Sequence, residues 1–214
     1  MIISPGRGYI FVHIPKTGGT SMALALEDRA MMDDILIGDT PKAKRRKGRL
    51  TSAKTAGRLW KHSTLADIEG DLVPGALEDY FVFTMVRNPW DRLVSYYHWL
   101  QEQSFDHPAV HLAKSTEFGA FLDHPETEAA FRAQTYASYV TTRGAEHCAS
   151  FLRLEYLDED IETLEAHLGF SLRPLSHENR SKRPSDYRSC YSQRAAERVA
   201  DLCAQDIARF GYVF

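Results

Sequence analysis

The residues best suited to chemistry lie near the start of the chain, in the segment PKTGGTS at positions 15–21. It holds one lysine, two glycines that let a backbone approach a ligand closely, and hydroxyl residues. An apolar run, Tyr9–Ile14, precedes it, and strong helix formers at 22–30 follow it. We therefore predict a strand, a glycine loop and a helix. The N–H groups of such a helix N-terminus are suited to binding phosphate or sulfate.

The order of residues distinguishes this loop from the ATP-hydrolysing loop GxxxxGK[ST]. Lys16 comes before the glycine pair, and the loop is shorter than the ATP-hydrolysing one. This order disfavours ATP or GTP hydrolysis of the Walker type. The structural alternative is a strand-to-helix turn that binds nothing.

Arg87 and Ser95 form a second pair of residues that could bind a phosphate; the loop at 15–21 and this pair are called the two phosphate grips. A nearly continuous apolar run at 80–86 predicts a strand, and Arg87 follows it directly. Pro89 suits the first turn of a helix, which we predict to run to about Gln103 and to carry Ser95. A guanidinium fork and a hydroxyl two turns along the helix can converge on one phosphate. Alternatively, Arg87 pairs with Asp91 and only caps the helix.

Two separate phosphate grips predict a ligand with two phosphate-like groups set apart. A nucleoside with a 3′-phosphate and a 5′-diphosphate-like chain fits that description. Three hypotheses remain at this point: a group-transfer enzyme that uses such a nucleotide, a small-molecule kinase with an atypical phosphate loop, and a non-catalytic nucleotide-binding module.

The elements that position these residues alternate along the chain. Further helices are predicted at 117–122, 129–140, 158–168 and 193–210, and a strand at 150–154. Strands that alternate with helices predict an α/β fold, with three layers and a central parallel sheet flanked by helices. Ligands bind beyond the carboxyl ends of the strands in such sheets, and both phosphate grips lie there. The length suits one domain, 1–214.

The charge is unevenly distributed. The formal net charge is −3, so attraction to anions must be local. Six of the eight residues from Lys42 to Arg49 are basic, within a segment, 33–57, that we interpret as a variable basic loop or lid. The run is a solvated or mobile loop, or a cationic lip for an anionic acceptor or nucleotide. Because no aromatic residues interleave with the charges, a nucleic-acid partner is disfavoured.

Cysteine content and hydropathy bear on location. Cys148, Cys190 and Cys203 are far apart and form no CxxC motif, which disfavours a zinc site and indicates free thiols of a reducing compartment. No run approaches the roughly 18 apolar residues of a membrane helix, and no signal peptide precedes the first strand. We therefore expect a soluble, cytoplasmic protein without a membrane span.

Both phosphate grips resemble motifs of the sulfotransferase superfamily. FVHIPKTGGTS resembles its 5′-phosphosulfate loop, and FTMVRNPWDRLVSYY, about 70 residues later, resembles its 3′-phosphate motif. The branch resembled contains carbohydrate sulfotransferases such as heparan sulfate 2-O-sulfotransferase and many bacterial proteins. The likeness extends to KHST at 61–64, to FLRLEYLDEDIETLEAHLGF and to the C-terminal region, so that it covers most of 9–214.

The resemblance implies a P-loop-like fold and 3′-phosphoadenosine 5′-phosphosulfate as donor, with adenosine 3′,5′-bisphosphate as product and no metal. It assigns to the 5′ end of the donor Lys16, Thr17, Gly18, Gly19, Thr20 and Ser21. It assigns Arg87 and Ser95 to the 3′-phosphate. A closing segment, 179–183, would lie over the adenosine and the 3′-phosphate and would contribute Arg180, Ser181 and Lys182.

The implied reaction is in-line transfer of a sulfuryl group to a hydroxyl acceptor, which the basic run suggests is an anionic carbohydrate. Lys16 would stabilise the leaving oxygen. His62 is the candidate base, because imidazole titrates near working pH and the resembled branch uses a histidine in the corresponding segment. His13 is a minor alternative. Glu27 and Asp91 are carboxylate alternatives, because other sulfotransferases use a glutamate.

Overall fold

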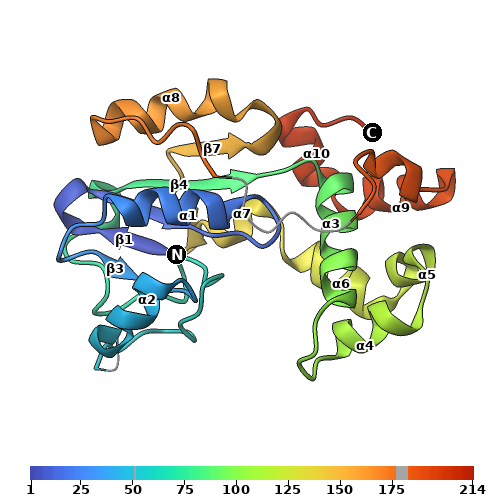
Figure 1. Ribbon diagram of the computed structural model, residues 1–214, viewed down its shortest axis with the longest axis horizontal. Coiled ribbons are helices and arrows are strands. Elements are labelled where there is room, and N and C mark those ends of the chain that lie inside the picture. Colours follow the sequence, from blue (N-terminus) through green and yellow to red (C-terminus); the bar gives the residue numbers. More distant parts are fainter. Residues whose placement is uncertain (51, 177–182) are drawn as a thin grey trace. The chain divides into compact units, whose positions relative to one another are not determined.

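The computed structural model describes residues 1–50, 52–176 and 183–214, and Figure 1 shows its elements. The chain forms two compact units. The first comprises Met1–Val86 and Tyr136–Glu178, and the second comprises Arg87–Thr135 and Asn179–Phe214. Residues 15–21, the predicted phosphate loop, belong to the first unit, and Arg87 with Ser95 to the second.

The first unit is built on a five-stranded sheet. Its order is β3 (Ile35–Leu36), β1 (Ile2–Ser4), β2 (Tyr9–Val12), β4 (Phe81–Val86) and β7 (Ser150–Arg153). β2, β4 and β7 run parallel, whereas β1 pairs antiparallel with both of its neighbours. The predicted α/β class, a central sheet flanked by helices, is thus confirmed, with a sheet that is mostly rather than wholly parallel. β1 and β3 escaped prediction because two or three residues show no periodicity.

Helices α1 (Gly19–Asp28) and α8 (Leu157–Leu168) pack on this sheet, and α8 lies along β7 (Figure 1). One hydrophobic cluster joins alternate strand residues to both helices, and its members include Tyr9, Phe11, Phe83, Met85, Leu152, Met22, Leu26, Ile161 and Leu164. The intervening strand residues are buried as well, among them Ile10, Val12 and Val82. Both faces of the sheet are therefore covered. This packing holds in place the C-terminal end of β2, after which the phosphate loop begins.

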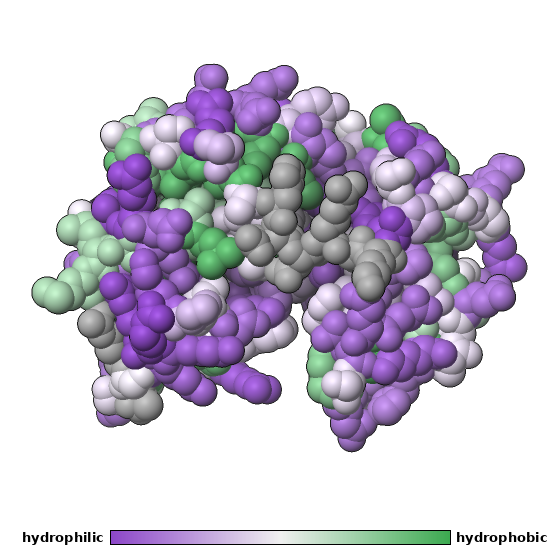
Figure 2. Space-filling model, in the orientation of Figure 1, coloured by the Kyte–Doolittle hydropathy of each residue, from purple (hydrophilic) through white to green (hydrophobic). Residues whose placement is uncertain are grey.

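The basic run begins as a helix, α2 (Pro41–Arg46), and not as a loop. Thr40 caps this helix, because its Oγ1 accepts a hydrogen bond from the backbone N–H of Ala43 at 3.1 Å. Lys42 donates to the carbonyl oxygen of Glu27, and Arg46 donates to the carbonyl oxygen of Met31 at 2.8 Å. The surface over α2 is hydrophilic (Figure 2). Two side chains of the basic run are thus held by hydrogen bonds to the backbone of the first unit.

The second unit is helical. Its helices are α3 (Pro89–Gln101), α4 (Pro108–Ser115), α5 (Phe118–Asp123), α6 (Pro125–Ala133), α9 (Gln193–Leu202) and α10 (Ala204–Phe210). The predicted helix 193–210 was wrong as a single element, because Cys203 has non-helical backbone angles and separates α9 from α10. The predicted helix 129–140 is likewise two: α6 ends at Ala133, and α7 (Tyr136–Tyr139) begins where the chain enters the first unit.

The remaining short elements complete the described chain. A two-stranded sheet pairs β5 (Thr141–Thr142) with β6 (Ala145–Glu146). The 3₁₀ turns are Pro5–Arg7, Lys47–Leu50, Leu77–Asp79, Leu154–Tyr156 and Tyr187–Cys190. Among the described residues, no helix has the length and apolar character that crossing a membrane requires.

Candidate active site

The phosphate loop joins β2 to α1 and has an unusual backbone. Lys16 and Gly18 both adopt left-handed conformations, with φ of 67° and 87°. Alternation between left- and right-handed residues turns successive N–H groups toward one side, which forms a concave anion site. Gly18 is the N-cap of α1 and provides no side-chain cap. The helix N-terminus and the concave loop together fit a phosphate or sulfate group.

The side chains of the loop divide into inward- and outward-facing sets. Thr17 is fully buried, and its Oγ1 donates to the carbonyl oxygen of Ile14 at 2.9 Å. Its hydroxyl therefore holds the loop in shape, and only its backbone could meet a ligand. Lys16, Thr20 and Ser21 are partly exposed. Of the predicted loop ligands, these three keep side chains within reach of solvent.

Gly19 is required by its neighbour His13. A Cβ built on Gly19 would lie 2.2 Å from Cδ2 and 2.6 Å from Nε2 of His13, so the imidazole packs directly on the first residue of α1. His13 is 6% exposed, and burial is the main cause that lowers the pKa of its side chain well below the usual value. His13 is therefore a neutral packing residue beneath the phosphate loop.

His62 lies against the same segment. β2 ends at Val12 and not at the predicted Ile14, and the carbonyl oxygen of His13 lies 2.8 Å from Nδ1 of His62. A carbonyl only accepts hydrogen bonds, so Nδ1 carries the proton and Nε2 keeps the lone pair. The two imidazole rings meet edge to face with centroids 4.7 Å apart, and Trp60 packs edge-on to His62 at 5.0 Å. The structure thus brings His62 and the phosphate loop together through His13.

Burial also lowers the pKa of His62, to about 3, although its bond to the His13 carbonyl acts in the opposite direction. The neutral imidazole is the form that can accept a proton. A pKa this low makes the imidazole a weak base. An anion bound nearby would favour the imidazolium and raise the pKa.

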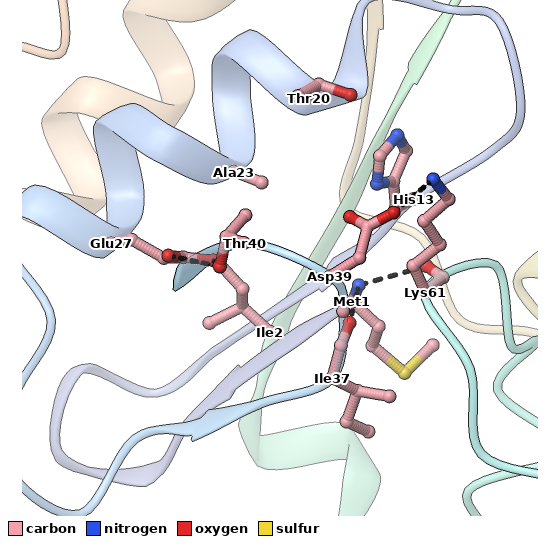
Figure 3. Close-up of a pocket in the computed structure, with 11 residues that line it drawn as sticks. Met1, Ile2, His13, Thr20, Ala23, Glu27, Ile37, Asp39, Thr40 and Lys61 are labelled. Carbon is pink, nitrogen blue, oxygen red and sulfur yellow. Dashed lines mark hydrogen bonds and ion pairs between the residues drawn. The ribbon is translucent and has the colours of Figure 1, made fainter. Parts of the chain in front are cut away.

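A small pocket with both polar and apolar lining lies beside α1 in the first unit (Figure 3). Its volume is about 20 Å³, enough for about one water molecule. Its polar lining includes Thr20 and His13, an ion pair between Lys61 Nζ and Asp39 Oδ2 at 2.7 Å, and the carboxylate of Glu27. The pocket is too small for a sugar, so an acceptor would have to lie outside it.

Glu27 is 5% exposed and accepts a hydrogen bond from Thr40 Oγ1 at 2.7 Å, and burial raises its pKa. The Glu27 carboxylate therefore links α1 to Thr40, the N-cap residue of α2. Asp91 is engaged as well, because it accepts hydrogen bonds from two arginines. Both carboxylate alternatives to His62 thus have structural partners.

Arg87 and Ser95, the second predicted phosphate-binding pair, lie at the start of α3. Asn88 caps this helix, with its Oδ1 accepting from the backbone N–H of Trp90 at 3.1 Å, and Pro89 occupies the first turn. Arg87 Nε donates to Asp91 Oδ2 at 2.8 Å, which is the pairing foreseen as the structural alternative. Ser95 lies one turn beyond Asp91 and is buried. Arg87 and Asp91 are thus brought together in the second unit, and Ser95 follows one turn further along the same face of α3.

The remaining predicted donor ligands, Arg180, Ser181 and Lys182, lie outside the described residues. Sequence reasoning missed the contact of the next residue, Arg183, with Asp91 Oδ1 at 2.5 Å. The signal for it was present, because Arg183 belongs to the basic segment 179–183 that the resemblance assigned to the donor site. In the described ranges, no group of three or more His, Cys, Asp or Glu side chains is arranged to hold a metal ion.

Residues 1–213 match the profile of the sulfotransferase family. The match spans almost the whole chain, and the protein therefore belongs to the sulfotransferase family. No curated protein sequence matches this chain at a significant level. Among solved structures, the chain is similar to the crystal structure of mouse sulfotransferase SULT7A1 complexed with PAP, with 15% sequence identity and a TM-score of 0.45 over 96% of this chain and 85% of that one.

Proposed function

We propose that this sulfotransferase transfers a sulfuryl group from 3′-phosphoadenosine 5′-phosphosulfate to a hydroxyl acceptor. Family membership supports the reaction class. The observation that carries the choice of donor is the left-handed backbone at Lys16 and Gly18, followed by a helix N-terminus without a side-chain cap. This arrangement fits the phosphosulfate end of such a nucleotide.

In this proposal the loop residues 16–21 hold the 5′ end of the donor, and Arg87 with Ser95 holds the 3′-phosphate. Residues 180–182, which lie outside the described residues, are proposed as further ligands of the donor. Both sets serve one nucleotide, and residues 1–214 act as one transferase domain. Support comes from the Arg87 guanidinium, which Asp91 holds beside the first turns of α3. A guanidinium held in this way is suited to fork-like recognition of phosphate.

The donor, when bound, supplies the sulfuryl group. His62 Nε2 accepts the proton of the attacking hydroxyl as the new S–O bond forms. Lys16 offsets the negative charge that develops on the bridging oxygen as the old S–O bond breaks. Support for His62 comes from its tautomer, which the His13 carbonyl oxygen sets so that the lone pair lies on Nε2.

We further propose that the acceptor is a carbohydrate, and an anionic one. Trp60, which packs against His62, is 49% exposed and offers an aromatic surface beside the candidate base. Exposed basic side chains of α2 and its extension, Lys44, Arg45 and Lys47, add positive charge to the same unit. A cytoplasmic location stays a prediction that rests on the cysteine pattern.

Calorimetry with adenosine 3′,5′-bisphosphate, set against ATP with Mg²⁺, tests the donor. We expect the bisphosphate to bind and ATP to bind far more weakly, because the loop lacks the Walker order. Tight binding of ATP without any binding of the bisphosphate would favour the kinase hypothesis and refute ours. Binding of the bisphosphate without any turnover of acceptors would favour the non-catalytic module.

Two variants separate the proposed roles. His62→Ala should lower turnover by about 10²–10⁴-fold and leave the Kd of the bisphosphate near normal. Arg87→Ala should weaken bisphosphate binding first. His111→Ala, at an exposed histidine in α4, is the matched control and should change neither quantity. Loss of bisphosphate binding in His62→Ala would assign His62 to the fold or the nucleotide site.

A further inference from the structure

One carboxylate in the second unit binds two guanidiniums from segments far apart in the sequence. Asp91 Oδ2 accepts from Arg87 Nε at 2.8 Å and from Nη2 at 2.5 Å. Its other oxygen, Oδ1, accepts from Arg183 Nη1 at 2.5 Å. All three side chains are largely buried, with 13–17% of each exposed. Asp91 therefore uses both of its oxygens to hold two arginines next to each other.

These arginines lie by one face of α3. Asp91, Ser95 and His98 follow one another at spacings of four and three residues, which places them on the same side of a helix. Burial lowers the pKa of His98, and the positive charge of Arg183 is the second cause. The charge of Arg183 thus acts on His98 as well as on Asp91, with which it pairs.

The charges of this cluster suit a phosphate. Two guanidiniums and one carboxylate leave a net charge of about +1, whereas a phosphate monoester carries about −2 near pH 7. Without the carboxylate, the two guanidiniums would repel each other at close range. Holding each planar fork in one orientation also removes rotamer freedom before a ligand arrives, which lowers the entropic cost of binding.

We propose that Asp91 is a positioning residue. It aligns Arg87 and Arg183 as a two-arginine clamp for the 3′-phosphate, and so sets the preference of the site for nucleotides that carry this group. The inference rests on the proposed function, which assigns the 3′-phosphate to Arg87. Arg183 is added to the ligands of that group, and Asp91 acts through the two arginines.

The sign of one substitution distinguishes this role from a passive one. A carboxylate that merely lies near a bound phosphate repels it, so Asp91→Asn would then tighten binding of the anion. A carboxylate that aligns the clamp has the opposite effect, because its loss lets the guanidiniums move apart. The direction of the change is therefore as informative as its size.

The experiment measures, by calorimetry, the Kd of adenosine 3′,5′-bisphosphate and of adenosine 5′-monophosphate, which lacks the 3′-phosphate. We expect wild-type protein to prefer the bisphosphate. Asp91→Asn should weaken bisphosphate binding by about tenfold or more, equal to about 1.4 kcal/mol, and change monophosphate binding by less than about twofold. Asp91→Glu keeps the charge and should restore part of the preference.

Glu128 in α6 offers a matched control in the same unit, because it also binds two arginines. It accepts from Arg132 Nε at 3.0 Å and from Arg198 Nη2 at 2.6 Å. Glu128→Gln should leave both dissociation constants unchanged. A loss of preference in this variant equal to that of Asp91→Asn would overturn the proposal, because the effect would then be a general loss of ion pairs.

The outcomes also separate this inference from the proposed function. If wild-type protein binds both nucleotides equally, the assignment of the 3′-phosphate fails. If wild-type protein prefers the bisphosphate and Asp91→Asn keeps or tightens that preference, only the clamp fails. Should circular dichroism show that Asp91→Asn does not fold, Arg183→Met replaces it. It should weaken bisphosphate binding by about fivefold or more, and an unchanged ratio of the two constants would overturn the clamp.

Discussion

Replacement of Gly19 by alanine probes the packing beneath the phosphate loop. Gly19 is the first residue of α1 and has no left-handed backbone, so alanine is conformationally acceptable there. Glycine to alanine at a helical position stabilises by about 0.5–1 kcal/mol. The added methyl group would, however, lie 2.2 Å from the buried ring of His13. Overpacking of this kind costs about 1–3 kcal/mol. We therefore expect Gly19→Ala to destabilise the protein by about 0.5–2 kcal/mol.

The sign should reverse when the ring is removed. In a His13→Ala background the methyl group has space, so Gly19→Ala should stabilise by about 0.5–1 kcal/mol. The backbone carbonyl that holds His62 is kept in all of these variants. Urea unfolding of the four proteins, followed by circular dichroism, gives the coupling energy, which we expect to be about 1–3 kcal/mol.

Gly119, in α5, is the control for the helical gain, because a Cβ built there meets no atom within 4 Å. Gly119→Ala should stabilise the protein in both backgrounds. An effect of Gly19→Ala with the same sign with and without the His13 ring would refute the packing argument. A coupling energy below about 0.5 kcal/mol would do so too, because that is the level of additivity between independent sites.

Two further predictions concern stability. Folded His62, with its pKa lowered to about 3, stays neutral when the unfolded chain begins to take up a proton below about pH 6.5. The contribution of His62 to the free energy of unfolding is therefore fully present above this pH. It falls on acidification, by about 2 kcal/mol between pH 7 and pH 5. His62→Gln should flatten the pH dependence of the urea-unfolding free energy by that amount, and an unchanged slope would contradict the burial of the imidazole. Thr40→Ala removes both the N-cap of α2 and the hydrogen bond that the Thr40 hydroxyl donates to Glu27. The free energy of unfolding should therefore fall by about 2 kcal/mol. Thr40→Ser keeps both bonds and should change stability by less than about 0.5 kcal/mol, and an equal loss in the two variants would be evidence against these bonds.

The strand, glycine loop and helix around residues 9–28 could be predicted from sequence, because their residue types follow one another in a fixed order. Lysine, two glycines and hydroxyl residues between an apolar run and a helix former leave few alternatives. The C-terminal end of β2 could not be predicted, because it depends on the neighbouring strand. The pairing with β4 stops at Val12, and the next carbonyl oxygen, that of His13, accepts a hydrogen bond from His62 instead.

Contacts between distant segments escaped prediction for the same reason. Nine histidines were available, and only a fold that brings positions 13 and 62 together explains why His62 can hold one tautomer. Arg183 was visible as part of a basic segment, but its pairing with Asp91 depends on two segments 92 positions apart. Short-range patterns contain no information about such pairs.

The hydrogen bonds that Lys42 and Arg46 donate to the backbone limit how many charges of the basic run could bind an acceptor. Among the basic side chains of the run that the structure describes, which exclude that of Arg49, Lys42 and Arg46 donate to backbone carbonyls of the first unit, whereas Lys44, Arg45 and Lys47 are exposed. For a linear polyanion, each neutralised charge releases about one condensed counterion. If the acceptor is an anionic polymer bound by these three side chains, its affinity should fall with roughly the third power of salt concentration. The six basic residues of the run would suggest about the sixth power instead.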